Sequence, residues 1–332
     1  MLHPLFQLAR SCFSPAKALF CAFAMIVCSG PGFAQPGGAL DYKISGDKIV
    51  IPFEYTMHQI VLQASAPGAP KMSLLLDTGS EYCVLDSDLK LEGSDDKQIG
   101  VNIHQGKKKM MKFSLNSLKL GEGMENVSVS NLPVLRNDYS RVSAKLKRRI
   151  DGVLGLSFLS GYVLEIDYPG RKLRFSLPEN EAMEPSRIRN AHCFRLMLLN
   201  PRQPFSILTL DGTFPQNRMH PLIIDTGFGG VACFTHKVAK ESGLLQEDTV
   251  RTPAGSTDSE GANRCEAIIA SKLLLGSIDL SGETVLIDPP LSASVEHPGM
   301  IGNRFLENYL VIYDYKNKSL TMQSTKVSEA QN

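Results

Sequence analysis

The sequence predicts an all-β protein built from two duplicated β lobes with a few short helices. Short apolar runs separated by turn-forming residues fill the chain after residue 40, which is typical of strands rather than of long helices. Two Asp-Thr-Gly triplets, beginning at Asp77 and Asp225, each follow an apolar run. Gly152 opens a Gly-x-x-Gly segment 75 residues beyond Asp77, and Gly299 opens another 74 residues beyond Asp225. Because the two spacings match, the triplets indicate a duplication rather than two unrelated turns.

The N-terminal residues 1–34 have the pattern of a signal peptide. Arg10 and Lys17 precede an apolar run at residues 18–28, and breakers and small residues follow up to Ala34. We expect cleavage after about Ala34. The apolar run is shorter than the roughly 20 residues that cross a bilayer, so a retained anchor or a buried helix is disfavoured. The mature protein is therefore predicted to be periplasmic or secreted, without stable membrane insertion.

Composition limits the partners of the mature chain. At 332 residues the protein can hold two cores, and removing residues 1–34 leaves 33 basic and 34 acidic residues. This balance gives no electrostatic basis for binding nucleic acid, and we expect none. Four cysteines remain, which permit up to two disulfides in three full pairings that sequence does not rank. They have no metal-ligand spacing, so no metal is expected. These cysteines are Cys83, Cys193, Cys233 and Cys265.

The elements follow from the order of apolar runs and turn residues. The segment 64–70 holds two prolines and a glycine and is interpreted as a turn. The run that ends at Leu76 is apolar without alternation, which predicts a buried strand carrying the residue after it. Strands are expected at residues 49–55, 59–62, 72–76, 110–115, 117–120 and 127–129, and short helices at 157–161, 235–242 and 304–309.

An internal repeat sets the domain boundaries. A shift of 147 places residues 152–159 over residues 299–306, whereas the two triplets superpose at a shift of 148. The polar segment 179–187 lies between the copies and is the expected linker. We therefore expect an N-terminal lobe at residues 41–178 and a C-terminal lobe at residues 188–325.

The pairing of Asp77 with Asp225 would create an acid–base site. Two carboxylates at contact distance share one proton and titrate as a unit. The ionised member can then act as a general base on a bound water, and the protonated member can act as an acid. The sequence does not assign these two roles to one residue or the other.

The neighbours of each aspartate are candidate supporting residues. Gly79 and Gly227 admit a tight turn and leave backbone N–H groups close to the carboxylates. Thr78 and Thr226 carry hydroxyls that could tie each loop to the opposite lobe. Ser80 is expected to offer its hydroxyl to the ionised pair.

The combination of motifs resembles the pepsin/retropepsin superfamily of aspartyl proteases. Each Asp-Thr-Gly loop has a downstream hydrophobic-hydrophobic-Gly, at residues 153–155 and 300–302. The Phe-Leu-x-x-Tyr and Asp-Tyr elements that end both copies are most similar to bacterial retropepsin-like enzymes. The resemblance implies a bilobal fold with both lobes in one chain, and therefore a monomer, with Asp77 and Asp225 catalytic. It further implies a polypeptide substrate, an aspartic-type endopeptidase activity, and no metal or organic cofactor.

The sequence departs from that family at the second triplet and at the flap. Phe228 follows the second triplet where the family has a small residue, and the pepsin flap tyrosine has no match in residues 90–120. Two flap hairpins are instead expected at residues 99–112 and 251–265. We expect the missing hydroxyl at Phe228 to raise the apparent pKa values of the dyad and to extend activity towards neutral pH. The alternative is that the Phe228 ring packs against the opposite lobe or lines a pocket.

The sequence is also compatible with functions other than peptide hydrolysis. A protease-like protein could persist as a catalytically silent peptide-binding module. Hydrolysis of a substrate other than a peptide is also open. Two ordinary β-turns would account for the triplets alone, but not for the matched downstream glycines.

Overall fold

The computed structural model describes residues 19–21, 27–28, 39–103, 106–122, 125–178, 191–201, 205–258, 261–288 and 299–325. Strands dominate these residues, and the predicted all-β bilobal fold is confirmed. Its strands up to the middle of the chain are β1 (Leu19–Cys21), β2 (Val27–Cys28), β3 (Asp41–Ile44), β4 (Lys48–Pro52), β5 (Glu54–Thr56), β6 (Gln59–Ala66), β7 (Ala69–Leu76), β8 (Cys83–Asp86), β9 (Gly93–Ile103), β10 (Gly106–Glu122), β11 (Glu125–Asn137), β12 (Gly152–Leu154), β13 (Val163–Asp167) and β14 (Lys172–Ser176).

The second half of the chain repeats this organisation. Its strands are β15 (Ala191–Arg195), β16 (Met197–Leu198), β17 (Leu208–Thr213), β18 (Met219–Ile224), β19 (Ala232–Thr235), β20 (Thr252–Asp258), β21 (Gly261–Ile269), β22 (Leu274–Leu275), β23 (Ile278–Asp279), β24 (Thr284–Asp288), β25 (Gly299–Ile301), β26 (Tyr309–Asp314) and β27 (Ser319–Ser324). The described helices are α1 (Ser140–Leu146), α2 (Leu156–Leu159), α3 (His236–Glu241), α4 (Asn303–Leu306) and the 3-10 turn η2 (Pro215–Asn217).

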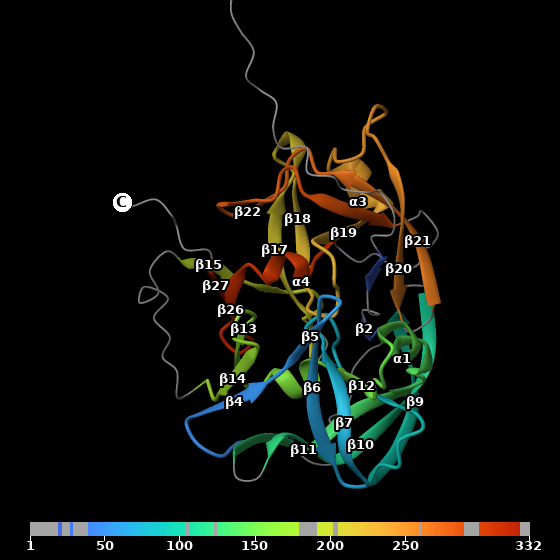
Figure 1. Cartoon of the computed structure of the whole chain (residues 1–332), viewed down its shortest axis with the longest axis vertical. Coiled ribbons are helices and arrows are strands. Elements are labelled where there is room, and N and C mark those ends of the chain that lie inside the picture. The colour runs from blue at the N-terminus through green and yellow to red at the C-terminus, as the bar shows by residue number, and fades with distance from the viewer. Residues whose placement is uncertain are drawn as a thin grey trace, which may run out of the picture.

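Each half forms one large sheet, and the two sheets have the same strand order. The first runs β9-β10-β11-β8-β12-β7-β6, and the second runs β20-β21-β24-β19-β25-β18-β17. Figure 1 shows β6, β7, β10 and β11 in the lower part of the molecule and β17, β18, β19 and β21 in the upper part. The duplication inferred from the sequence is therefore present in the strand connectivity.

The strand that carries each triplet is buried in the centre of its sheet. Leu74, Leu75 and Leu76 are fully buried at the end of β7, which pairs with the parallel strand β12. In the second half β18 pairs in parallel with β25 in the matching register. A strand covered on both faces needs a continuous apolar run, which explains why these segments do not alternate.

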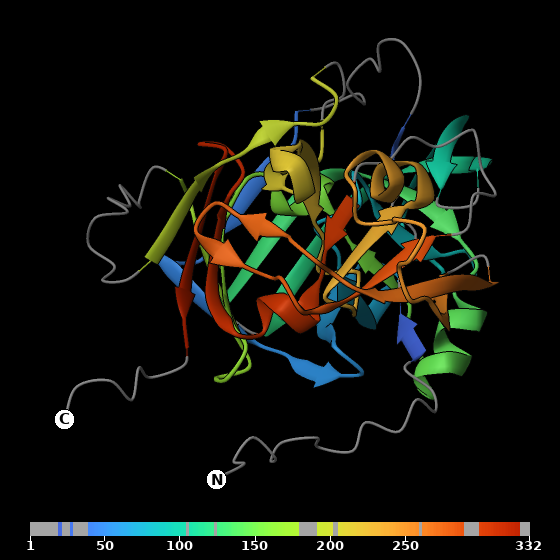
Figure 2. The same ribbon diagram turned by 90° about the horizontal axis from the view of Figure 1, so that it is seen from above.

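A third sheet joins the two halves. Its order is β15-β27-β26-β13-β14-β4, so three strands come from each half. Both views place it at one side of the molecule, alongside the two lobes (Figure 1, Figure 2). At its centre β13 pairs antiparallel with β26, and Glu165 lies opposite Ile312. Ile312 is the residue that the 147-residue shift assigns to Glu165, so each strand pairs with its own repeat.

Several predicted boundaries are corrected by the structure. The expected strand at residues 49–55 is two strands, because β4 pairs with β14 in the third sheet whereas β5 pairs with β6 in the first lobe. The strands expected at residues 110–115 and 117–120 are one strand, β10. It continues because β11 pairs with it from Met111 to Glu122, on both sides of residue 116.

The helices are close to their predicted places. α2, α3 and α4 lie within the regions expected at residues 157–161, 235–242 and 304–309, or begin one residue earlier. α3 begins after Thr235, whose hydroxyl accepts the Val238 N–H at 3.2 Å, as an N-cap residue does. α1 was not predicted.

The two expected flap hairpins are formed by β9 with β10 and by β20 with β21. Their last described pairs are Ile103 with Gly106 and Asp258 with Gly261, and the turns between them lie outside the described residues. The predicted linker at residues 179–187 also lies outside them. Of the predicted signal peptide only β1 and β2 are described, and they pair with β20 and β9. No helix in the described ranges is long and apolar enough to cross a membrane.

Candidate active site

The two Asp-Thr-Gly loops start where the buried strands β7 and β18 end. The Asp77 N–H donates to the carbonyl of Leu154 at 3.1 Å, and the Asp225 N–H donates to the carbonyl of Ile301 at 2.9 Å. These acceptors belong to β12 and β25, the strands that begin with the downstream glycines. The matched spacing in the sequence therefore reflects a strand that supports each loop from within its own lobe.

The structure brings the carboxyl groups of Asp77 and Asp225 together. Both residues are buried, with relative exposures of 1% and 0%. Within its own loop each carboxylate accepts a backbone N–H, from Gly79 to Asp77 Oδ1 at 2.9 Å and from Gly227 to Asp225 Oδ1 at 2.7 Å. Each carboxyl lies against the glycine of the opposite loop, and the charge of Asp225 acts on Asp77. The remaining oxygens, both Oδ2, accept no hydrogen bond from a donor group in the described part of the chain, so they are available to a shared proton and a bound water.

Glycine at the third position of each triplet is required by the opposite carboxyl. A Cβ added to Gly79 would lie 2.5 Å from the carboxyl carbon of Asp225, and one added to Gly227 would lie 2.6 Å from that of Asp77. Any side chain at either position would therefore push the two carboxyls apart.

Thr78 and Thr226 bind the two loops to each other. The hydroxyl of Thr78 donates to the carbonyl of Ile224 at 2.6 Å, and that of Thr226 donates to the carbonyl of Leu76 at 3.0 Å. Each hydroxyl also accepts the backbone N–H of the other threonine, at 3.1 Å in both cases. This is the interlobe arrangement that the resemblance implied for these two residues.

Burial raises the pKa values of both carboxyls, and the charge of Asp225 raises that of Asp77 further. Burial is the largest cause for each, because it penalises the charged form. The pKa of Asp77 lies well above its usual range, with the charge of Asp225 as the second cause. The pKa of Asp225 is raised to about 6, and the N–H groups of Gly227 and Phe228 oppose the rise. The pair can therefore hold one proton over a wide range of pH.

The expectation that Ser80 offers its hydroxyl to the pair is wrong, whereas the expected effect of Phe228 on the pKa values stays a prediction. The Ser80 hydroxyl donates to the carbonyl of Tyr82 at 2.8 Å and is turned to its own loop rather than to the dyad. The Phe228 ring is fully buried and packs against Gly230 and Gly302 within its own lobe. Ser80 and Phe228 instead act on the dyad alike, through their backbone N–H groups, which lower the pKa values of Asp77 and Asp225 respectively.

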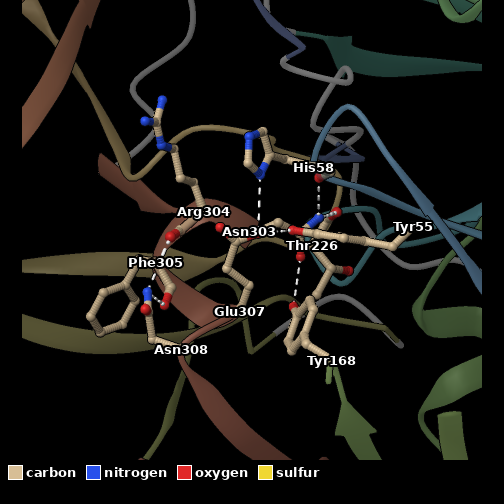
Figure 3. A network of polar contacts seen from close by, with 9 residues as sticks. All are labelled: Tyr55, His58, Tyr168, Thr226, Asn303, Arg304, Phe305, Glu307 and Asn308. Carbon is tan, nitrogen blue, oxygen red and sulfur yellow. Dashed lines mark hydrogen bonds and ion pairs between the residues drawn. The ribbon is translucent and has the colours of Figure 1, made fainter. Parts of the chain in front are cut away.

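Asn303 is a site residue that sequence reasoning missed. It is fully buried, and its amide nitrogen donates to the carbonyl of Thr226 at 2.5 Å and to that of His58 at 2.9 Å. Its amide oxygen accepts the hydroxyl of Tyr168 at 2.7 Å. Figure 3 shows Asn303 between these three residues, two of which belong to the first lobe. The repeat contains a signal for this residue. The 147-residue shift aligns the polar Asn303 with the apolar Leu156, so the two copies differ in residue type at this position.

A second contact between the lobes lies beside Asn303. Glu307 accepts the Tyr55 hydroxyl at 2.6 Å and faces His58 Nδ1 at 3.0 Å (Figure 3). Burial acts to raise the pKa of Glu307, but the hydrogen bonds from His58 and Tyr55 outweigh it, so this pKa lies below its usual range. These contacts hold the turn between β5 and β6 against the C-terminal end of α4.

The four cysteines after residue 34 are free thiols, so none of the permitted disulfides is formed among them. Cys83, Cys233 and Cys265 are buried and Cys193 is exposed. Among the described residues, no group of three or more His, Cys, Asp or Glu side chains could hold a metal ion.

Comparisons with known proteins find a matching sequence family and similar folds. Residues 62–158, which include the first triplet and its downstream glycines, match the sequence profile of a family described as aspartyl protease. The fold is similar to that of basic 7S globulin from soybean, with a TM-score of 0.50 and 13% identity over 86% of this chain and 96% of that one. It is equally similar to an aspartic proteinase from Irpex lacteus, with a TM-score of 0.50 and 12% identity over 85% of this chain and 99% of that one. No curated protein matches the chain in sequence.

Proposed function

Because the chain belongs to the retropepsin- and pepsin-like aspartyl proteases, we propose that it is an aspartic-type endopeptidase with Asp77 and Asp225 as its catalytic pair. The observation that carries the proposal is the burial of two carboxyls, each against the glycine of the opposite loop, between two loops that are bound to each other. Thr78, Gly79, Thr226 and Gly227 support the pair, and Ser80 supports it through its backbone. No metal or organic cofactor takes part in the proposed reaction.

The chemistry follows from a pair that holds one proton. The ionised carboxylate takes a proton from water as the water oxygen bonds to the peptide carbonyl carbon. The protonated carboxyl gives its proton to the carbonyl oxygen as the C=O double bond opens. The resulting diol then breaks at its C–N bond. The nitrogen takes the proton that the first carboxyl received from water, and a diol hydroxyl gives its proton to the other carboxylate as the C=O bond re-forms, which restores the pair. A buried site makes each of these charge shifts more sensitive to the protein groups around it.

The edges of the two hairpins support a polypeptide substrate. β2 pairs antiparallel with β9 at Val101 and Asn102, and β1 pairs with β20 at residues 255–257. An extended chain is therefore accommodated at the edge of each hairpin, close to its turn. If residues 1–34 are removed as the sequence predicts, both edges become free to accept a substrate by strand addition.

Cleavage-site profiling with a peptide library tests the proposal. Wild type is expected to cut peptides, and Asp77→Asn and Asp225→Asn are each expected to lose most of the activity. The double variant should lose little more than either single one, because residues that act as a unit are not additive. Asp248→Asn, at an exposed position, is the matched control and should cut at the wild-type rate.

The alternative function is a catalytically silent peptide-binding module. One of the two similar structures is named as a globulin and the other as a proteinase, so the shared fold is compatible with both functions. Binding of a pepstatin-like transition-state mimic, abolished by Asp77→Asn, with no cleavage of any peptide, would favour the silent module. Cleavage that survives in Asp225→Asn would contradict the proposed catalytic pair.

We also propose that the mature protein is a periplasmic or secreted monomer that begins after about Ala34. Its lobes are assigned to residues 41–178 and 188–325, joined by the linker 179–187. N-terminal sequencing of the exported protein and its mass in solution test the processing site and the monomeric state.

A further inference from the structure

We propose that Asn303 and Gln59 are positioning residues that make Asp225 the charged member of the pair and leave the shared proton on Asp77. The assignment of base and acid rests on the proposed function, but the location of the charge does not require a substrate to be tested. It would make Asp225 the general base and Asp77 the general acid.

Asn303 acts on Asp225 through one peptide group. The carbonyl of Thr226 and the N–H of Gly227 belong to the same peptide, so the hydrogen bond from Asn303 to that carbonyl polarises the N–H. This N–H donates to Asp225 Oδ1 at 2.7 Å. A stronger donor favours the charged form of the carboxyl that it faces.

Gln59 acts in the same way on the next peptide. Its side chain is fully buried, and Nε2 donates to the carbonyl of Gly227 at 3.3 Å. That carbonyl shares its peptide with the N–H of Phe228, which donates to the backbone carbonyl of Asp225 at 3.2 Å and lowers the pKa of the Asp225 carboxyl. Two successive peptides behind Asp225 are therefore each held by an amide side chain.

The amide orientation of Asn303 is set by its partners. Its nitrogen faces two carbonyl oxygens, of Thr226 and His58, and its oxygen faces the hydroxyl of Tyr168. The reversed orientation would oppose oxygen to oxygen at both carbonyls. The donor to Thr226 is consequently fixed by a contact with the other lobe.

The first loop has different residues at the matching positions. Leu156 aligns with Asn303 at a shift of 147, and Ile207 aligns with Gln59 at a shift of 148, so neither position carries an amide. Gly79 donates to Asp77 as Gly227 does to Asp225, but at 2.9 Å rather than 2.7 Å. The direction of the pKa values agrees, since that of Asp225 rises to about 6 and that of Asp77 rises well above its usual range.

The titratable groups around the second loop are few. Asp77 is the ionisable side chain that faces Asp225, and Tyr168, His58 and Glu307 stand behind Asn303. All three residues hydrogen-bond to Asn303. They therefore provide control variants that disturb the same network without removing the donor to Thr226.

The experiment is a titration of the aspartate carboxyl carbons by 13C NMR in the full chain. The two signals are assigned by their loss in Asp77→Asn and Asp225→Asn. In wild type, between the two apparent pKa values, Asp225 should have the shift of a carboxylate and Asp77 that of a carboxylic acid. The reverse assignment would overturn the proposal.

Two variants then test the positioning residues. Asn303→Leu introduces the residue that the first lobe has at the matching position 156. Gln59→Met removes the Nε2 donor and leaves only the carbonyl of Gly227 without its partner. Each is expected to raise the lower apparent pKa by roughly half a pH unit. Gln59→Met carries the test if Asn303→Leu does not fold. Tyr168→Phe and Glu307→Gln keep both donors and should leave this pKa unchanged.

The outcomes separate this inference from the proposed function. An unmoved pKa in Gln59→Met and Asn303→Leu, or an equal rise in Tyr168→Phe, overturns the role of the two amides. A rise confined to the amide variants supports it even if no variant cleaves a peptide, in which case only the endopeptidase function fails. With activity present, the acid limb of the pH–rate profile should move by the same amount as the NMR titration.

Discussion

Thr78 and Thr226 bind each other reciprocally, because the backbone N–H of each donates to the hydroxyl of the other at 3.1 Å. Each hydroxyl also donates to the last carbonyl of the opposite strand, at Ile224 and Leu76. All four hydrogen bonds cross from one lobe to the other and are buried. The geometry of the carboxyl pair therefore depends on two hydroxyl groups that do not touch it.

Thr78→Val is expected to lower the free energy of unfolding by roughly 2–4 kcal/mol. The substitution keeps the shape but leaves the Ile224 carbonyl and the Thr226 N–H buried without partners. Thr78→Ser keeps the hydroxyl and should cost only about 1 kcal/mol for the lost methyl group. Urea denaturation of the three proteins at one pH measures the difference. Equal losses in the two variants would show that packing, rather than the hydroxyl, holds the loop.

Stability is expected to fall as the pH rises from about 4 through about 6. The folded pKa values of Asp77 and Asp225 lie above the value of about 3.9 for an unfolded aspartate, so the folded state binds more protons in this window. The stability present below the unfolded pKa is lost as each folded carboxyl ionises. Asp225→Asn should consequently be more stable than wild type at pH 7.5, by up to roughly 3 kcal/mol, and equally stable near pH 3.5.

Thermal unfolding of wild type, Asp225→Asn and Asp248→Asn across this range provides the measurement. Glu307, with its lowered pKa, contributes in the opposite direction but does so equally in all three proteins. An Asp225→Asn curve parallel to that of wild type would mean that the folded pair titrates like exposed carboxyls.

Ser80→Ala is expected to leave the acid limb of the pH–rate profile where it is in wild type, near pH 6. The Ser80 hydroxyl is bonded to the carbonyl of Tyr82, and the pKa of Asp225 is raised to about 6 chiefly by burial. Phe228→Leu should likewise leave the limb in place while lowering the melting temperature, because the ring is a buried packing group. An acid limb that moves upward in Ser80→Ala would show that the hydroxyl reaches the pair after all.

Much of the fold could be predicted because the features that repeat are patterns of residues close to each other in the sequence. The runs before Asp77 and Asp225, the hairpins at residues 99–112 and 251–265, and three of the short helices all follow from neighbouring residues. The break after Pro52 and the continuity of β10 could not, since both depend on strands that are distant in the sequence.

The site was predictable where both copies agree and not where they differ. The triplets and the threonine hydroxyls repeat, and the structure brings them together. The hydrogen bond from Asn303 to the carbonyl of His58 joins residues 245 positions apart, which no periodic pattern encodes. The role expected of Ser80 was wrong for a related reason, because the direction of a hydroxyl depends on an acceptor two residues away in a folded loop.

The pairing of Glu165 with Ile312 has a consequence for symmetry. A strand that pairs in register with its own repeat is the arrangement that two separate, identical chains would adopt around a twofold axis. Two identical chains, however, must present identical loops, and their carboxyls would be equivalent until one proton settled between them. Joining the halves in one chain removes that requirement. Position 303 can then be an asparagine while position 156 stays leucine. The two aspartates can therefore differ in protonation because the sequences around them differ.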